Sequence, residues 1–123
     1  MKQAIYIFML LFTATALQAQ SGIQKLADKA AFETAVKSNE KVVVVFAAEW
    51  CDYCKAYLPQ VEGIVKDYKG IKFFKVYYDE NVAFFKTEGI KSIPTTKLYK
   101  NGVKVAGMVV LKAEPLQEKL QDF

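Results

Sequence analysis

The spacing of apolar positions changes several times along the chain, and each change predicts a different element. Val42 to Ala47 is apolar and β-branched without alternation, which is typical of a strand buried on both faces. From Cys51 to about Lys69 the apolar residues instead fall on one helical stripe. Pro59 is expected to kink this helix and Gly70 to end it. Residues 72–78 are rich in aromatic side chains and predict a second central strand.

The remaining segments predict that parallel units are followed by an antiparallel hairpin and a final helix. Asn101 and Gly102 are a strong turn signal, because both residues accept positive φ. Asp28 is a candidate cap for the first helix. The expected strands are 23–26, 95–99 and 103–110, and the expected helices are 30–38, 81–87 and 114–121. The order βαβαβαββα predicts an α/β protein built as a three-layer sandwich with a mixed central sheet.

Residues 1–19 have a different character from the rest of the chain. Lys2 precedes an apolar run from Ala4 to Leu17, which is short for a membrane span but suits the core of a signal peptide. Cleavage is expected after Ala19, with Ala16 as a second site and an uncleaved anchor as the alternative. Residues 20–123 would then form one exported domain in the periplasm or another extracytoplasmic space, where disulfides persist.

Charge and composition narrow the function classes. The 123 residues carry a net charge of +4, and every basic side chain is a lysine spread among acidic residues. Nucleic-acid sites rely on arginine for bidentate contacts, so no nucleic-acid partner is expected. The chain also contains no histidine, the commonest general base and metal ligand. We therefore expect neither a metal nor a cofactor, and we take a monomer as the default state.

Candidate chemistry centres on the two cysteines, Cys51 and Cys54, at the predicted junction of strand and helix. The N-terminus of a helix favours an anion, and a thiolate is the species that attacks disulfides. This placement predicts Cys51 as the nucleophile and Cys54, one turn further, as the resolving thiol. A structural disulfide, a zinc site short of ligands and a redox-silent pair are the alternatives at this point.

The order of motifs along the chain resembles that of the thioredoxin family over nearly all residues after 19. The matching positions are Phe46 to Lys55, Pro59, Lys75, Asp79, Gly89 to Thr95, Lys100 to Gly102, and Gly107. The resemblance implies the thioredoxin fold, with a cis Pro94 packed beside the cysteines. It also implies that the backbone of Ile93 pairs with the extended chain of a substrate, and that Trp50 forms part of the rim.

The departures from the family pattern concern the surroundings of the cysteines. Typical thioredoxins carry a buried aspartate where this chain has Val45. Lys75, which matches the usual partner of that aspartate, is expected either to reach Glu49 or to lie on the surface. Lys75 and Glu49 are therefore candidates for support of proton transfer. Asp52 and Tyr53 replace the usual Gly-Pro, and Tyr53 is expected to be exposed and to shape partner contacts.

Together these features predict a disulfide reductase or general exchange protein that acts on disulfide-containing exported proteins. A redox partner, such as a membrane-bound electron donor, would reduce the cysteine pair again. The alternatives are a disulfide oxidase or isomerase and a non-enzymatic binding or assembly module of the same fold. The other aromatic residues are expected to pack in the core rather than bind a cofactor: Phe73, Phe74, Tyr77, Tyr78, Phe84 and Phe85.

Overall fold

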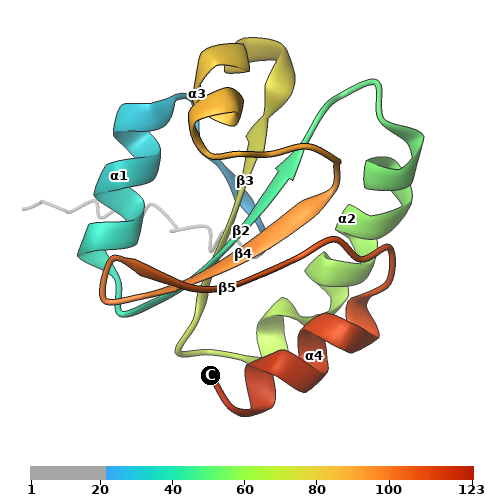
Figure 1. The fold of residues 1–123 in the computed structure, drawn as a ribbon. Helices are drawn as coiled ribbons and strands as arrows, with labels where there is room; N and C mark the ends of the chain where they lie inside the picture. The colour runs from blue at the N-terminus through green and yellow to red at the C-terminus, as the bar shows by residue number, and fades with distance from the viewer. Residues whose placement is uncertain (1–21) are drawn as a thin grey trace, which may run out of the picture.

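The computed structural model describes residues 22–123, and the expected signal peptide lies outside this range. Five strands form one sheet in the order β1-β3-β2-β4-β5 (Figure 1). β1, β3 and β2 run parallel, whereas β4 pairs antiparallel with both β2 and β5. The strands are β1 (Gln24–Lys25), β2 (Lys41–Ala47), β3 (Lys72–Tyr77), β4 (Thr95–Lys100) and β5 (Val103–Met108). The mixed sheet predicted from the element order is confirmed.

The helices are α1 (Lys29–Ser38), α2 (Asp52–Ile64), α3 (Val82–Thr87) and α4 (Ala113–Gln121), with short 3₁₀ turns η1 (Val65–Asp67) and η2 (Tyr78–Glu80). α1 and α3 cover one face of the sheet, and α2 and α4 cover the other (Figure 1). Asp28 caps α1 as expected, because its Oδ1 accepts the Ala31 N–H at 2.9 Å. The three-layer architecture is therefore confirmed.

β2 is the centre of the sheet, and its apolar run serves both layers. Val43 and Val45 point into the layer under α2 and α4, whereas Val44 and Phe46 point into the layer under α1 and α3. All four side chains are completely buried. An unbroken apolar strand is required here because alternate side chains of a strand face opposite sides.

Several boundaries differ from the prediction. α2 ends at Ile64 rather than near Lys69, and a 3₁₀ turn with a Tyr68 N–H to Val65 O bond of 3.1 Å follows it. β5 ends at Met108, where its pairing with β4 ends. Pro59 lies inside α2, which continues through it. A proline removes one donor but does not end a helix whose apolar face is already packed.

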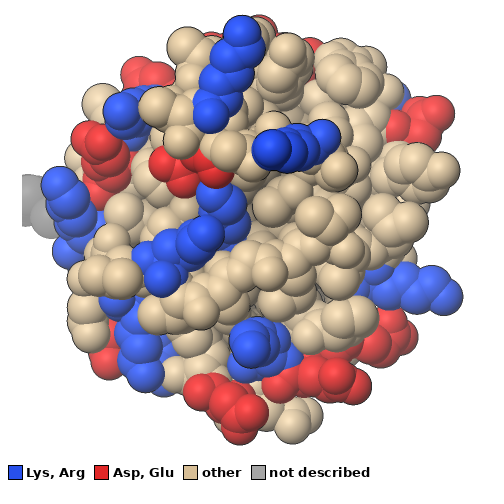
Figure 2. All heavy atoms as spheres, in the orientation of Figure 1, with Lys and Arg blue, Asp and Glu red and all other residues tan. Residues whose placement is uncertain are grey.

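Lysine and acidic side chains are interspersed over the face shown in Figure 2, and in several places they lie next to one another. In residues 22–123, no helix has the length and apolar character needed to cross a bilayer. The same part of the chain contains no cluster of three side chains that could ligate a metal.

Candidate active site

The cysteine pair lies at the junction between the central strand β2 and helix α2. Cys51 is the N-cap residue of α2, and its Sγ accepts the Cys54 N–H at 3.1 Å. The two residues form a disulfide, with their Cα atoms 5.2 Å apart. Cys51 is 6% exposed and Cys54 only 1%. Of the two residues, Cys51 is therefore the more accessible to solvent, as expected for the attacking residue.

The backbone around Cys51 favours an anion at its sulfur. The first N–H groups of a helix have no partner within the helix, and the helix dipole is positive at this end. In the reduced protein, the Cys54 N–H that bonds the Cys51 sulfur would stabilise a Cys51 thiolate. The arrangement matches the chemistry that thiol–disulfide exchange requires, because the thiolate is the attacking form.

Asp79 holds the loop in front of the cysteines, a role that the sequence analysis did not assign. Its Oδ2 accepts the Glu49 N–H at 2.9 Å. Asp79 lies in η2 directly after β3, and β3 runs parallel to β2. The carboxyl ends of parallel neighbours meet at one edge of the sheet, so an acidic residue after β3 was the signal available in the sequence.

The loop before β4 brings a second element to the disulfide. The Ile93–Pro94 peptide bond is cis, as the family resemblance implied. The carbonyl oxygen of Ile93 lies 4.0 Å from Cys51 Sγ. The Thr95 hydroxyl closes this loop by donating to the Ser92 carbonyl oxygen at 2.5 Å. The structure thus brings Cys51 together with Ile93 and Pro94, although Cys51 and Ile93 are 42 positions apart in the sequence.

A groove of about 270 Å³ adjoins the site, lined by Trp50, Tyr78, Phe85 and residues 90–93. Trp50 is 62% exposed, and its ring meets the ring of Tyr78 edge-on at 6.3 Å between centroids. Tyr53, 65% exposed, lies between the two cysteines in sequence. Trp50 and Ile93 are therefore in position to contact a polypeptide beside Cys51, and their binding role stays a prediction.

The expectation that the aromatic residues pack in the core is confirmed for four of them and wrong for one. Tyr78 is 36% exposed and lines the groove, because η2 turns the chain outward directly after β3. Tyr77 is partly buried against the layer under α2. The four buried ones are Phe73, Phe74, Phe84 and Phe85.

Lys75 and Glu49 do not form the contact that was one alternative for them. Among residues 22–123 the ion pairs are Lys25–Glu80 and Lys97–Glu88. Lys75 Nζ instead lies 5.6 Å from the ring centre of Tyr77, with the side chain partly exposed. Glu49 is exposed, and only its backbone N–H takes part in the site. A role for either side chain in proton transfer remains a prediction.

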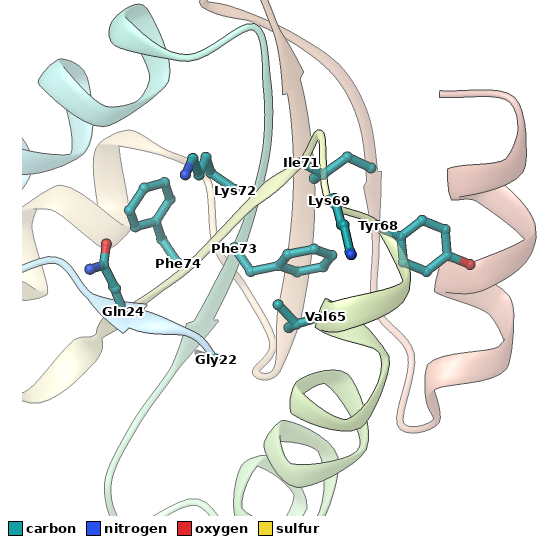
Figure 3. A pocket seen from close by; sticks show the side chains of 9 residues that line it. All are labelled: Gly22, Gln24, Val65, Tyr68, Lys69, Ile71, Lys72, Phe73 and Phe74. Carbon is teal, nitrogen blue, oxygen red and sulfur yellow. The ribbon is translucent and has the colours of Figure 1, made fainter. Parts of the chain in front are cut away.

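A larger cavity of about 470 Å³ lies at the opposite end of the sheet (Figure 3). It is lined by Gly22, Gln24 and the first residues of β3, together with Val65 and Tyr68 after α2. The cysteines lie instead at the carboxyl end of β2. Size alone therefore does not locate the site, since the larger cavity contains no nucleophilic thiol.

The fold and the cysteine site define the class as a thiol–disulfide oxidoreductase. Comparisons with known proteins agree: the Thioredoxin family model matches residues 23–122. Thioredoxin 1 of Plasmodium falciparum is 34% identical over 101 residues, which cover 82% of this chain and 97% of the relative. Thioredoxin of Rickettsia bellii is 43% identical over 76 residues, 61% of this chain and 72% of the relative.

Solved structures give the same result. A Plasmodium falciparum thioredoxin structure superposes with a TM-score of 0.78 at 34% identity, covering 82% of this chain and 99% of that one. Oxidised mitochondrial thioredoxin 3 of Saccharomyces cerevisiae superposes with a TM-score of 0.77 at 28% identity, covering 82% and 95%. The chain belongs to the thioredoxin family, and its Cys51–Cys54 pair is the redox-active centre of a protein-disulfide oxidoreductase.

Proposed function

We propose that this protein reduces disulfide bonds in exported proteins through cycling of Cys51 and Cys54 between dithiol and disulfide. The Cys51 thiolate attacks a substrate disulfide, forms a mixed disulfide and releases the first substrate sulfur. Cys54 then attacks the Cys51 sulfur, so the Cys51–Cys54 bond forms and the second substrate sulfur leaves as a thiol. A membrane-bound electron donor that supplies two electrons and two protons would return the pair to the dithiol.

The observation that carries the chemistry is the position of the Cys51 sulfur. It caps α2, accepts the Cys54 N–H at 3.1 Å and lies 4.0 Å from the Ile93 carbonyl oxygen. An extended substrate chain lying along the loop before Pro94 would therefore meet the sulfur at its exposed side. The groove beside Trp50 and Tyr78 offers apolar surface for side chains next to the substrate cysteine.

The N-terminal segment supports the exported location. The region that matches the family model begins at residue 23, so the preceding apolar run is an addition to the family's domain. Lys2, the run from Ala4 to Leu17 and the small residue Ala19 have the order of a signal peptide. Export would place the cysteine pair in an oxidising space, where a reductase needs a source of electrons.

Activity is tested by reduction of insulin with dithiothreitol as electron donor. We expect wild-type protein to accelerate insulin precipitation and Cys51→Ser to lose at least about a hundredfold in rate, because no thiolate remains at the helix N-terminus. Lys119→Gln, on the exposed side of α4, serves as the matched control and should keep full activity. A Cys51→Ser variant as active as wild type would exclude the mechanism.

Whether the protein reduces or oxidises its substrates is tested by equilibrating the Cys51–Cys54 pair with glutathione buffers and measuring its reduction potential. Among proteins of this kind, reductases have potentials near about −270 mV and strong oxidases near about −120 mV. We expect a value in the lower part of this range. A potential near the upper end would instead identify an oxidase, which the replacement of Gly-Pro by Asp52 and Tyr53 leaves open.

Export is tested by the mass and location of the mature protein in a bacterial host. We expect residues 1–19 to be absent and the protein to lie outside the cytoplasm. Leu10→Lys, which interrupts the apolar run, should retain the full-length chain in the cytoplasm. Uncleaved wild-type protein in the cytoplasm would overturn the proposed location.

A further inference from the structure

Two hydroxyl groups meet in the otherwise apolar layer between α2, α4 and the sheet. The Tyr57 hydroxyl and Thr96 Oγ1 are 2.7 Å apart, and both residues are completely buried. Their neighbours in this layer are aliphatic residues, Phe73 and the two cysteines. A buried hydroxyl costs free energy unless it is hydrogen-bonded, and here each hydroxyl is the partner of the other.

The pair has one hydrogen more than the contact uses. Either oxygen can be the donor, and whichever donates leaves the hydrogen of the other hydroxyl free. The hydrogen bonds of residues 22–123 provide no second partner for Tyr57 or Thr96 side chains. Burial raises the pKa of Tyr57, against a smaller lowering by the Thr96 hydrogen bond. At neutral pH the pair is therefore an uncharged donor.

The hydroxyl pair lies in the same part of the core as the resolving cysteine, Cys54. Cys54 and Tyr57 are three residues apart in α2, which places them on the same face of the helix. Both belong to the same buried cluster, and both are at most 1% exposed. Thr96 is the direct partner of Val45 across the β2–β4 pair. The hydroxyl pair and Cys54 thus lie in one water-excluded layer.

Charged groups on this side of the sheet lie elsewhere. Lys75 on β3 is the register partner of Val45 but extends over the ring of Tyr77 and is partly exposed. Lys41 and Lys100 lie at the far end of β2 and β4, beside Phe123. Tyr68 also packs against the cluster from the end of η1, and the α4 side chains within it are Leu116 and Leu120. Among residues 22–123 no carboxylate-bearing side chain is buried.

In the disulfide form neither hydroxyl bonds the Cys54 sulfur, which is held by Cys51. We propose that, once reduction has freed the Cys54 sulfur, the Tyr57–Thr96 hydroxyl pair donates its free hydrogen to it and stabilises the Cys54 thiolate in the resolving step. The inference rests on the proposed disulfide exchange and adds two residues to it. Cys54 first loses its proton to solvent; the electron pair of its thiolate then forms the bond to Cys51 as the bond from Cys51 to substrate breaks, and the departing substrate thiolate takes up a proton from solvent when its own pKa requires it. A buried thiolate without a donor would have a strongly raised pKa, and a hydrogen bond to the charged form lowers it.

The test separates the two chemical steps in stopped flow. Reduced protein in excess reacts with dithiobis(nitrobenzoate), a disulfide that releases one coloured thiolate when Cys51 attacks and a second when Cys54 resolves. The second rate is measured across pH for wild type, Tyr57→Phe and Thr96→Val. Tyr99→Phe is the matched control, since it removes a buried tyrosine hydroxyl from the opposite face of the sheet.

We expect Tyr57→Phe and Thr96→Val to slow the second release about tenfold at neutral pH and to raise its midpoint by about one pH unit. The first release should keep its rate, and Tyr99→Phe should change neither phase. Thr96→Ser, which retains a hydroxyl, should recover most of the rate.

An unchanged second phase in Tyr57→Phe overturns the inference, as does a slowing that is equal at every pH or is shared by Tyr99→Phe. Failure of the proposed function would look different, because wild-type protein would then not release the first thiolate faster than an ordinary buried thiol. The two ideas are therefore tested in one experiment but fail separately.

Discussion

The two faces of the sheet are built from different kinds of residue. Under α1 and α3 the core is aromatic: Phe32 and Phe84 meet at 4.9 Å and Phe46 and Phe85 at 5.3 Å between ring centroids. Under α2 and α4 the core is mostly aliphatic and contains the disulfide. Aromatic contacts contribute large buried areas and specific geometry. Both faces bury core residues that stabilise the fold, and the second also forms the apolar layer around the reacting sulfurs.

The polar groups buried on the two faces differ in the same way. On the aromatic face, Lys97 Nζ donates to the Glu88 carbonyl oxygen at 2.7 Å, at the end of α3, and lies 5.5 Å from the ring centre of Phe46. On the cysteine face, the buried polar pair is neutral, formed by Tyr57 and Thr96. A full charge next to Cys54 would shift the pKa of its thiol strongly. The Lys97–Glu88 ion pair instead lies on the face that contains no reacting atom.

Phe46→Ala should have the largest effect on stability, because it removes the ring at the centre of the aromatic face. We expect the free energy of unfolding to fall by about 3–5 kcal/mol. The reduction potential of the folded variant should remain that of wild type, since Phe46 points away from the disulfide. Urea unfolding and glutathione equilibration measure the two quantities. A shift in the reduction potential of Phe46→Ala would contradict the idea that the aromatic face does not affect the disulfide.

Val45→Asp would place a charge on the face that lacks one. We expect a loss of about 1–3 kcal/mol at neutral pH, because the site is completely buried. Burial raises the pKa of such a carboxyl above its unfolded value, so the loss should be smallest below pH of about 4 and grow as pH rises. Unfolding at several pH values measures this dependence.

The new carboxylate should also accelerate the second thiolate release severalfold by accepting the Cys54 proton. Val43→Asp is the matched control, because Val43 faces the same layer two residues earlier. It should lose comparable stability without the gain in rate. Equal acceleration by both variants would show that the effect is general loosening of the core.

Tyr99→Phe should have the smallest effect and should be confined to high pH. Burial, then the charge and hydrogen bond of Glu88, raise the pKa of Tyr99 above its ordinary value of 10.0. Since the unfolded chain deprotonates first, wild-type stability falls once pH exceeds about 10, and this loss is absent below it. The Tyr99→Phe variant should lack this pH-dependent loss of stability, which amounts to at most about 1.4 kcal/mol per pH unit. Tyr53→Phe, at an exposed position, should retain it.

Much of the fold was predictable because it depends on local patterns. The unbroken run of β2, the helical stripe after Cys51 and the positive φ turn at Asn101 and Gly102 were each visible in short windows. The ends of elements were less predictable, as the 3₁₀ turn after Ile64 illustrates. Where a helix ends depends on which partners its last carbonyl groups find in the fold.

The site was predicted in part for the same reason. Cys51 and Cys54 lie within one helical turn, so their proximity follows from local geometry. Tyr78 was misplaced in the core because an aromatic residue next to a strand is usually buried, and only the turn at η2 exposes it. The Glu49–Asp79 contact spans 30 residues, and it depends on β3 being the neighbour of β2.

By itself, the order of residues determined the α/β architecture and the pair of thiols at a helix start, because both depend on interactions over a few positions. Only the tertiary structure decided which groups surround those thiols. Tyr57 and Thr96 are 39 residues apart and meet because α2 packs over β4 on one face. Nothing in either segment specifies that contact, since it results from how the sheet is ordered and how the helix packs on it.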